Sequence, residues 1–254
     1  SHNLGQNFSK VFDIEFLDTE NKKQNPWQTS WGLSTRSIGG LILVHGDNAG
    51  LVIPPRAAPV QVVVLTLPDK DETKQQQIVD YAKTVVETLK TAGLRAKLDA
   101  DNNQTFGNRA NKWELQGVPV RLEIGLKEIE KAEVTWARRD TFEKASMQLS
   151  NIATEIPKVL EYIQGELLKK SEETKKSLTK ETDNFEDYKN ILEGDRALTM
   201  VFWCEEAECE AKVKAETKSV SRCLPLENEN IKEDAKCFHC GKPASRKWLF
   251  GMSY

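Results

Sequence analysis

The chain has 254 residues, enough for one large domain or two to three small ones. Its 36 Lys and Arg residues nearly balance 39 Asp and Glu residues, and the net charge of −3 at pH 7 excludes a histone-like polycation. Six Trp and nine Phe residues can anchor cores, which argues against uniform disorder, and no stretch reaches the roughly 18–20 apolar residues of a membrane span.

The first residues, SHNLGQNF, have neither the basic start nor the apolar centre of a signal peptide, so we expect none. All five cysteines lie in the last fifth of the chain: Cys204, Cys209, Cys223, Cys237 and Cys240. An odd, clustered set without a secretory signal argues against a disulfide framework and for a reducing compartment. We therefore expect a cytoplasmic protein.

Residues 1–58 are rich in strand formers and glycine turns. Apolar and polar residues alternate over 12–16, which predicts a half-buried strand. The apolar run 41–44 is followed by a glycine-rich turn and then by the apolar residues 51–53, a pattern that predicts a hairpin. Prolines at 54, 55 and 59 then mark a domain boundary.

The following residues alternate between strand and helix patterns. The segment 61–67 (QVVVLTL) predicts a buried strand, and apolar residues at helical spacing from 78 to 89 predict a helix that Gly93 ends. Further strands are expected at 95–99, 120–124 and 134–136, and a long helix at 149–167. This order is typical of a compact α/β domain.

The charged run 169–182 (KKSEETKKSLTKET) predicts a solvated helix end or a linker. A third unit follows it. We expect three domains, at residues 1–58, 59–170 and 171–254.

The cysteine spacing predicts a metal site. Cys204 and Cys209 are separated by four residues, and Cys237 and Cys240 by two. Two such pairs offer four thiolates that can surround Zn²⁺ as a closed, structural site. The alternative is a set of unrelated buried cysteines. We expect Cys223 to be a buried free thiol outside the site. His239 lies between Cys237 and Cys240 and could replace a ligand, but we expect it to face solvent.

Arg36 stands between TSWGLST and SIGG. An arginine on a strand beside glycines can lie flat on an adenine ring and reach a triphosphate, but it can equally form a surface ion pair. The residues alone leave these readings about even. The segment 46–50 (GDNAG) lacks the lysine and the helix start of a phosphate loop, so we expect a structural turn.

The segment 113–121 (WELQGVPVR) contains glutamate and arginine, and more basic residues follow up to Lys144. A carboxylate can accept from guanine N–H groups, and a guanidinium can donate to guanine O6 and N7. These residues could form a local RNA patch. Taken alone, however, they favour a solvated strand edge.

Together, these segments resemble prolyl-tRNA synthetases. The stretch SHNLGQNFSKVFDIEF and the later WQTSWGLSTRSIGGLILVHGDNAGLVIPP are similar to the end of the catalytic domain of that family. WELQGVPVRLEIG and RRD are similar to its anticodon-binding domain. The CxxxxC…CxxC unit that ends in LFGMSY is similar to the C-terminal zinc-binding domain of the eukaryote/archaeal type.

The resemblance implies an α/β and α+β multidomain protein: the end of a class II antiparallel-sheet catalytic domain, an α/β anticodon-binding domain and a small zinc-binding domain. It implies ATP-dependent activation of proline, with Mg²⁺ accompanying ATP, and transfer of proline to tRNA(Pro). The implied partners are L-proline, ATP and tRNA(Pro), with a homodimer for the full-length enzyme and no membrane.

The resemblance also assigns roles to residues. The catalytic residue is Arg36, as the motif 3 arginine. The ATP site is lined by Gln28, Thr29 and Arg36. The proline site is lined by His2, Ser30, Trp31 and Gly32, and we expect Trp31 and Arg36 to share one cavity. The anticodon readers are Glu114, Arg121 and Lys144. The structural Zn²⁺ ligands are Cys204, Cys209, Cys237 and Cys240. Tyr254 corresponds to a C-terminal tyrosine that folds back toward the active site.

The class II motifs 1 and 2 are expected upstream of Ser1, so this portion alone should not activate proline. Two other hypotheses stay open: a non-catalytic tRNA- or protein-binding module derived from a class II synthetase, and a related synthetase for another amino acid. The ATP-pocket residues argue against the first of these, and the Trp31 wall and the zinc unit against the second.

Overall fold

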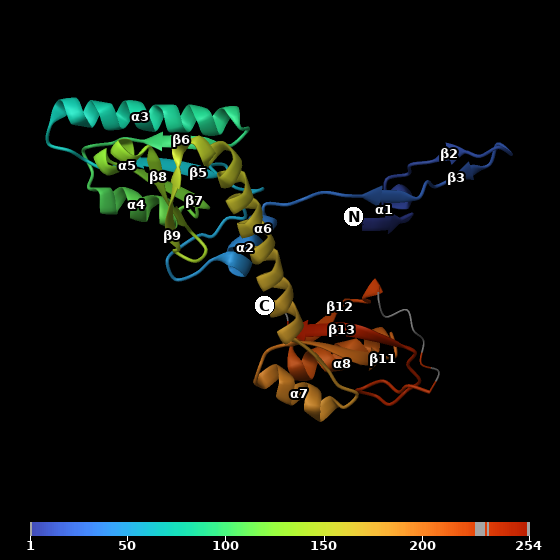
Figure 1. The fold of residues 1–254 in the computed structure, drawn as a ribbon. Coiled ribbons are helices and arrows are strands. Elements are labelled where there is room, and N and C mark those ends of the chain that lie inside the picture. Colours follow the sequence, from blue (N-terminus) through green and yellow to red (C-terminus); the bar gives the residue numbers. More distant parts are fainter. Residues whose placement is uncertain (1, 227–231, 233, 253–254) are drawn as a thin grey trace. The chain divides into compact units, whose positions relative to one another are not determined.

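The structure is a computed structural model that describes residues 2–226, 232 and 234–252. It divides the chain into two compact units, Ser1–Ile163 and Gln164–Tyr254 (Figure 1). No helix within the described residues combines the length and apolar character needed to cross a membrane. The expected α/β and α+β class is confirmed, whereas the three domain boundaries stay a prediction.

The first unit begins with short elements that have little core of their own. They are β1 (His2–Gly5), α1 (Asn7–Val11), β2 (Phe16–Leu17), β3 (Lys23–Gln24), β4 (Gln28–Ser30) and α2 (Arg36–His45). Strands β1 and β4 pair antiparallel, and so do β2 and β3. Of residues 2–51, only Ser9 is buried, and Trp27, Trp31, Leu33 and Leu43 each expose more than 70% of their surface.

Two of the expected strands in this segment are wrong. Residues 12–15 form no strand after helix α1, only Phe16 belongs to β2, and Phe12, Ile14 and Phe16 are all exposed instead of half-buried. The run 41–44 belongs to helix α2, so there is no hairpin with 51–53, and Arg36 opens a helix rather than lying on a strand. A short apolar run is ambiguous between strand and helix, and the i→i−4 hydrogen bond from Gly46 N to Ile42 O belongs to the helix.

The remainder of the first unit is a five-stranded sheet in the order β6-β5-β7-β8-β9. Its strands are β5 (Val62–Thr66), β6 (Ala96–Asp99), β7 (Val120–Ile124), β8 (Glu133–Arg138) and β9 (Lys144–Gln148). Strands β6, β5 and β7 are parallel, whereas β8 and β9 continue the sheet antiparallel. Its helices are α3 (Glu72–Thr91), α4 (Phe106–Leu115), α5 (Leu126–Lys131) and the start of α6 (Ile152–Ser177), which the 3-10 turn η1 (Leu149–Asn151) precedes.

Local sequence signals explain these elements, and the predicted strands at β5 to β8 and helices at α3 and α6 are confirmed. Strand β5 is buried at all five positions because helices cover both faces of the sheet (Figure 1). Helix α3 is capped at its N-terminus by Asp71, whose carboxylate accepts from the backbone N–H groups of Thr73 and Lys74. It ends before Gly93, which adopts φ +82°.

Helix α4 covers one face of the sheet and α3 the other (Figure 1). Trp113 of α4 packs with Val63 and Leu65 of β5, and its Nε1 donates to Asp99 Oδ2 at 2.6 Å. Arg109, also on α4, is fully buried and donates to the Asp99 carbonyl at 2.9 Å. These hydrogen bonds fix the orientation of α4 on the sheet, although Arg109 Nε has no partner among the described residues.

The segment after α2 is bonded to the end of α4. Leu51 N donates to Leu115 O at 3.1 Å, and Ile53 N donates to Gly117 O at 3.3 Å. Gly117 has φ +72°, and a Cβ there would lie 2.7 Å from the backbone of Leu51. Only glycine allows this close approach.

The second unit contains a four-stranded sheet in the order β10-β11-β13-β12, flanked by two helices. Its elements are β10 (Thr179–Glu181), α7 (Phe185–Glu193), β11 (Leu198–Trp203), α8 (Ala207–Thr217), β12 (Ser219–Cys223) and β13 (Arg246–Met252). Aromatic rings dominate its core: Tyr188, Phe238 and Phe250 form edge-to-face pairs with centroids 5.1–5.4 Å apart. The charged run after residue 169 is partly the end of α6, which continues to Ser177.

Candidate nucleic-acid interface and metal centre

A row of paired residues forms the floor of a cavity on the α4 face of the five-stranded sheet. Val63, Arg121, Ala137 and Lys144 are successive register partners across β5, β7, β8 and β9. Paired positions share one face of a sheet, and the small side chain of Ala137 leaves space between Arg121 and Lys144. The cavity has a volume of about 170 Å³. Its remaining walls are Trp113, Glu114, Val118, Arg138, Arg139 and Phe142.

Glu123 is the centre of a charge network beside this cavity, two residues from Arg121 on the same face of β7. Its side chain is buried, and it accepts from Arg121 Nε at 3.0 Å and from Lys144 Nζ at 3.0 Å. Arg121 also pairs with the Glu114 carboxylate of α4. A buried carboxylate needs such partners, so Glu123 fixes both cations in place. The network thus brings together the three predicted anticodon readers.

Arg139, another arginine of the cavity wall, is held by Asp47, a residue that precedes the first strand of the sheet. Arg139 donates to both carboxylate oxygens of Asp47 at 2.6 and 2.8 Å, and to the Glu114 carbonyl at 2.8 Å. The hydrogen bonds from Arg139 lower the pKa of Asp47 to about 2. Arg138 pairs with Asp140 at 2.6 Å. The arginines therefore keep fixed positions, as a preorganised recognition site requires.

The cavity can recognise a flat ligand with a polar edge. Glu114 offers acceptor atoms, Arg121 and Lys144 offer donors, and Trp113 adds an apolar wall. This combination suits the edge and face of an unpaired nucleobase. The sequence analysis did not identify Glu123 or Phe142. Glu123 looks like an ordinary strand residue in the sequence, and the place of Phe142 depends on the loop conformation. The one sequence signal was the spacing of Arg121 and Glu123, which puts opposite charges on the same face of one strand.

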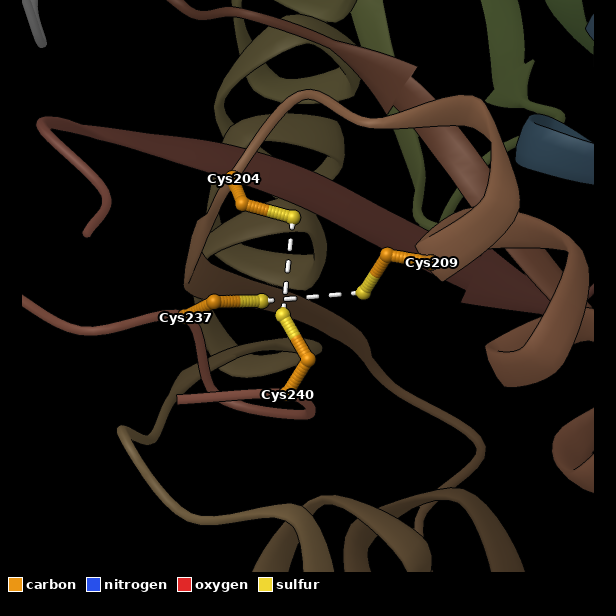
Figure 2. Close-up of side chains that lie close together, drawn as sticks. All are labelled: Cys204, Cys209, Cys237 and Cys240. Atoms are coloured by element: carbon orange, nitrogen blue, oxygen red, sulfur yellow. Dashed lines mark hydrogen bonds between the residues drawn. The ribbon is translucent and has the colours of Figure 1, made fainter. Parts of the chain in front are cut away.

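Four cysteine sulfur atoms of the second unit converge on one point (Figure 2). The atoms of Cys204, Cys209, Cys237 and Cys240 all lie within 4.8 Å of one another. The Cys209–Cys237 and Cys204–Cys240 sulfur distances are 3.8 and 3.7 Å. A tetrahedral Zn²⁺ with bonds of about 2.3 Å requires sulfur separations of about 3.8 Å. The four residues therefore fit this metal.

The surroundings of the cluster shift the pKa values of two of its thiols in opposite directions. Burial raises the pKa of Cys209 above its usual value, and the thiolate of Cys237 adds to this effect. Burial also raises the pKa of Cys237, but the backbone N–H groups of Cys240 and His239 outweigh it and lower that pKa overall. A metal ion would hold all four as thiolates.

Two expectations about neighbouring residues are wrong. His239 does not face solvent: its side chain is only 12% exposed, with Nδ1 3.4 Å from the Cys209 sulfur and Nε2 3.5 Å from Glu216. Its ring also packs against Phe185. If Zn²⁺ is bound, this contact would orient the Cys209 thiolate without His239 itself being a ligand. Cys223, expected to be buried, is exposed at the end of β12.

The predicted ATP and proline residues lie in the exposed segment before residue 46. Pairing of β1 with β4 sets His2 opposite Ser30, and it brings Thr29 and Gln28 into the same two-stranded ribbon. Trp31 is 85% exposed, and Arg36 is exposed at the start of α2. A shared cavity for Trp31 and Arg36 stays a prediction. Tyr254 lies outside the described residues.

Known protein families match two parts of the chain. Residues 61–159 match the family described as "Anticodon binding domain". Residues 185–254 match the family described as "Prolyl-tRNA synthetase, C-terminal". The first range contains the cavity with its charge network, and the second contains the cysteine cluster.

Relatives match along the whole chain. "Proline--tRNA ligase 2" of Clostridioides difficile is 41% identical over 254 residues, which are 100% of this chain and 52% of the relative. "Proline--tRNA ligase" of Acetoanaerobium sticklandii is 40% identical with the same coverage. The chain therefore spans about half the length of the curated relatives it matches.

Solved structures agree with these matches. A prolyl-tRNA synthetase from Cryptosporidium parvum, complexed with L-proline and AMP, has a TM-score of 0.92 at 40% identity. A second structure of that enzyme, complexed with halofuginone and AMPPNP, has a TM-score of 0.91. Each match covers 100% of this chain and 52% of the solved chain.

The cysteine cluster makes a testable prediction. Cys209→Ser should reduce bound zinc from about one ion per chain to nearly none and lower the melting temperature, because a four-thiolate site contributes folding free energy. Elemental analysis and thermal unfolding measure both. Cys223→Ser, which changes the exposed thiol outside the cluster, should change neither. Metal-free wild-type protein, or an unchanged melting point in Cys209→Ser, would contradict the site.

Proposed function

We propose that this chain, which corresponds along its whole length to the C-terminal half of prolyl-tRNA synthetases, is the C-terminal portion of a proline–tRNA ligase. The complete enzyme activates L-proline with ATP and transfers it to tRNA(Pro). In this proposal the chain supplies part of the catalytic pocket, the anticodon-reading domain and a structural zinc domain.

Two observations together carry the proposal: the chain matches prolyl-tRNA synthetases along its whole length, and it contains the charged cavity next to Glu123. Glu114, Arg121 and Lys144 line this cavity or pair within it, in the range that matches an anticodon-binding family. Glu114 accepts from guanine N–H groups, while Arg121 and Lys144 donate to O6 and N7. The cavity thus selects tRNA by the guanines of its anticodon.

The exposed N-terminal segment contributes to the reaction centre. Arg36 stacks on the adenine of ATP and contacts the triphosphate, where its permanent charge stabilises the pyrophosphate as it leaves. Gln28 and Thr29 line the ATP side of the pocket. The proline side is lined by His2, Ser30, Trp31 and Gly32. Gln28 Oε1 is buried and has no hydrogen-bond partner among the described residues, which suits a group that contacts bound substrate.

The apolar side chains of this segment support the same proposal. Thirteen large apolar side chains before residue 46 are exposed, among them Trp27, Trp31 and Leu43. Surface of this kind is normally covered by other protein. The other half of the catalytic domain in the longer enzyme would cover it.

The remaining parts of the proposal concern the environment of the protein. Zn²⁺ bound by the four cysteines stabilises the second unit and takes no part in the reaction, since four protein ligands leave no open position. Mg²⁺ accompanies ATP as part of the substrate. We place the enzyme in the cytoplasm, where thiolates stay reduced, and expect the full-length enzyme to be a homodimer.

A second candidate is a module that binds tRNA or protein without aminoacylating. The exposed apolar segment favours it only if that segment meets some other partner. The effect of replacing Arg36 on pyrophosphate exchange distinguishes the two candidates, because a module that only binds tRNA or protein does not need an arginine that contacts ATP.

Glu114→Gln tests the reading of the anticodon. It keeps the shape of the side chain but removes an acceptor, so charging of tRNA(Pro) by the full-length enzyme should fall about 5- to 100-fold. Proline-dependent pyrophosphate exchange should stay unchanged. Glu87→Gln, which alters an exposed carboxylate on α3 paired with Lys90, is the matched control and should affect neither assay. Equal loss in both assays would mean that Glu114 acts through folding.

Arg36→Ala tests the catalytic role. In the full-length enzyme it should reduce proline-dependent pyrophosphate exchange by roughly 100-fold or more, as expected for a lost contact to developing charge. Arg56→Ala, an exposed arginine whose carboxylate partner is Glu161, serves as the control and should retain exchange. Normal exchange by Arg36→Ala would remove Arg36 from the site, and absence of exchange by the wild type would favour the binding module.

A further inference from the structure

Phe142 adopts a backbone conformation that bulky residues normally avoid. It lies in the short loop between β8 and β9 with φ +60°, and its N–H donates to the Arg138 carbonyl at 3.1 Å to close the turn. The left-handed region favours glycine and asparagine, and an aromatic side chain there is an outlier. The protein therefore places a phenyl ring at a position where the ring is a disadvantage to folding.

Burial of the ring does not offset this disadvantage. Phe142 is 50% exposed, although a core phenylalanine would be almost fully buried. The ring contacts Arg139, whose guanidinium carbon lies 5.2 Å from the ring centroid. A contact of this kind between an exposed ring and a cation is weak. Folding alone therefore does not explain the residue.

The ring of Phe142 forms part of the cavity wall. Phe142 lines the same cavity as Glu114 and Arg121. Arg139, which is almost fully buried and held by two hydrogen bonds to Asp47, lies next to the ring. The ring is consequently a half-exposed apolar surface in the same cavity as a set of hydrogen-bond donors and acceptors.

From this arrangement we propose that Phe142 is a stacking platform for an unpaired base of the tRNA anticodon loop. Single-stranded RNA is commonly held by stacking bases on aromatic side chains, because every base offers a π-face. Glu114 and Arg121 then read the base edge, and Phe142 binds the base face. The assignment rests on the proposed function of the cavity in tRNA recognition.

The test compares two variants that distinguish the effect of losing the aromatic ring from the effect of the positive φ at this position. Phe142→Asn removes the ring but tolerates positive φ, whereas Phe142→Trp keeps an aromatic face. Binding of a tRNA(Pro) anticodon stem–loop to the 254-residue chain is measured by titration at several salt concentrations. Phe142→Asn should weaken binding about 5- to 100-fold, whereas Phe142→Trp should bind nearly as well as the wild type.

Two further readouts distinguish stacking from a structural role. Phe142→Asn should keep or raise the unfolding temperature and leave the salt slope of binding unchanged, since no phosphate-binding cation is lost. A stem–loop with 2-aminopurine in the anticodon should show fluorescence quenched by the wild type and restored by Phe142→Asn. A parallel fall in melting temperature and affinity, with no rescue by Phe142→Trp, would overturn the proposal.

Glu114→Gln in the same titration shows whether a negative result refutes only the stacking role of Phe142 or the anticodon site itself. Unchanged binding by Phe142→Asn together with weakened binding by Glu114→Gln would refute only the stacking role. Wild-type binding by both variants would refute the anticodon site as well.

Discussion

The cavity on the five-stranded sheet depends on one buried carboxylate. Glu123 lies on the same face of the sheet as the cavity floor, two residues along β7 from Arg121, and accepts hydrogen bonds from Arg121 and Lys144. Charged groups that leave water need close partners, so each of these ions fixes the others. The network extends through Arg121 to Glu114 on α4, and in this way one strand residue sets the positions of donors and acceptors from three elements.

The register of the strands brings residues that are distant in the sequence together in this site. Val63, Arg121, Ala137 and Lys144 are far apart along the chain but form one row across four strands. Periodicity in the sequence predicted most strands of this sheet and its helix α3. It could not predict the register, because pairing is decided by tertiary contacts. The candidate anticodon residues came from family resemblance, while Glu123 and Phe142 became visible only in three dimensions.

Other parts of the chain show where local patterns fail or succeed. The run 41–44 resembles a strand because a short apolar segment has no period of its own, and the structure makes it a helix whose residues are not buried. The cysteine spacing, by contrast, is a local signal with a geometric consequence, and the four sulfur atoms do converge (Figure 2). The environment of His239 was misjudged because its contacts with Cys209 and Phe185 come from segments remote in sequence.

The most direct test of the central claim is the effect of Glu123→Gln on base preference. Two anticodon stem–loops, one with the natural guanines and one with adenines in their place, are titrated against the 254-residue chain. The wild type should prefer guanine, and Glu123→Gln, with its cations no longer fixed, should lose about 10-fold or more of that preference while remaining folded. An unchanged preference in a folded variant would show that the buried carboxylate does not organise the site.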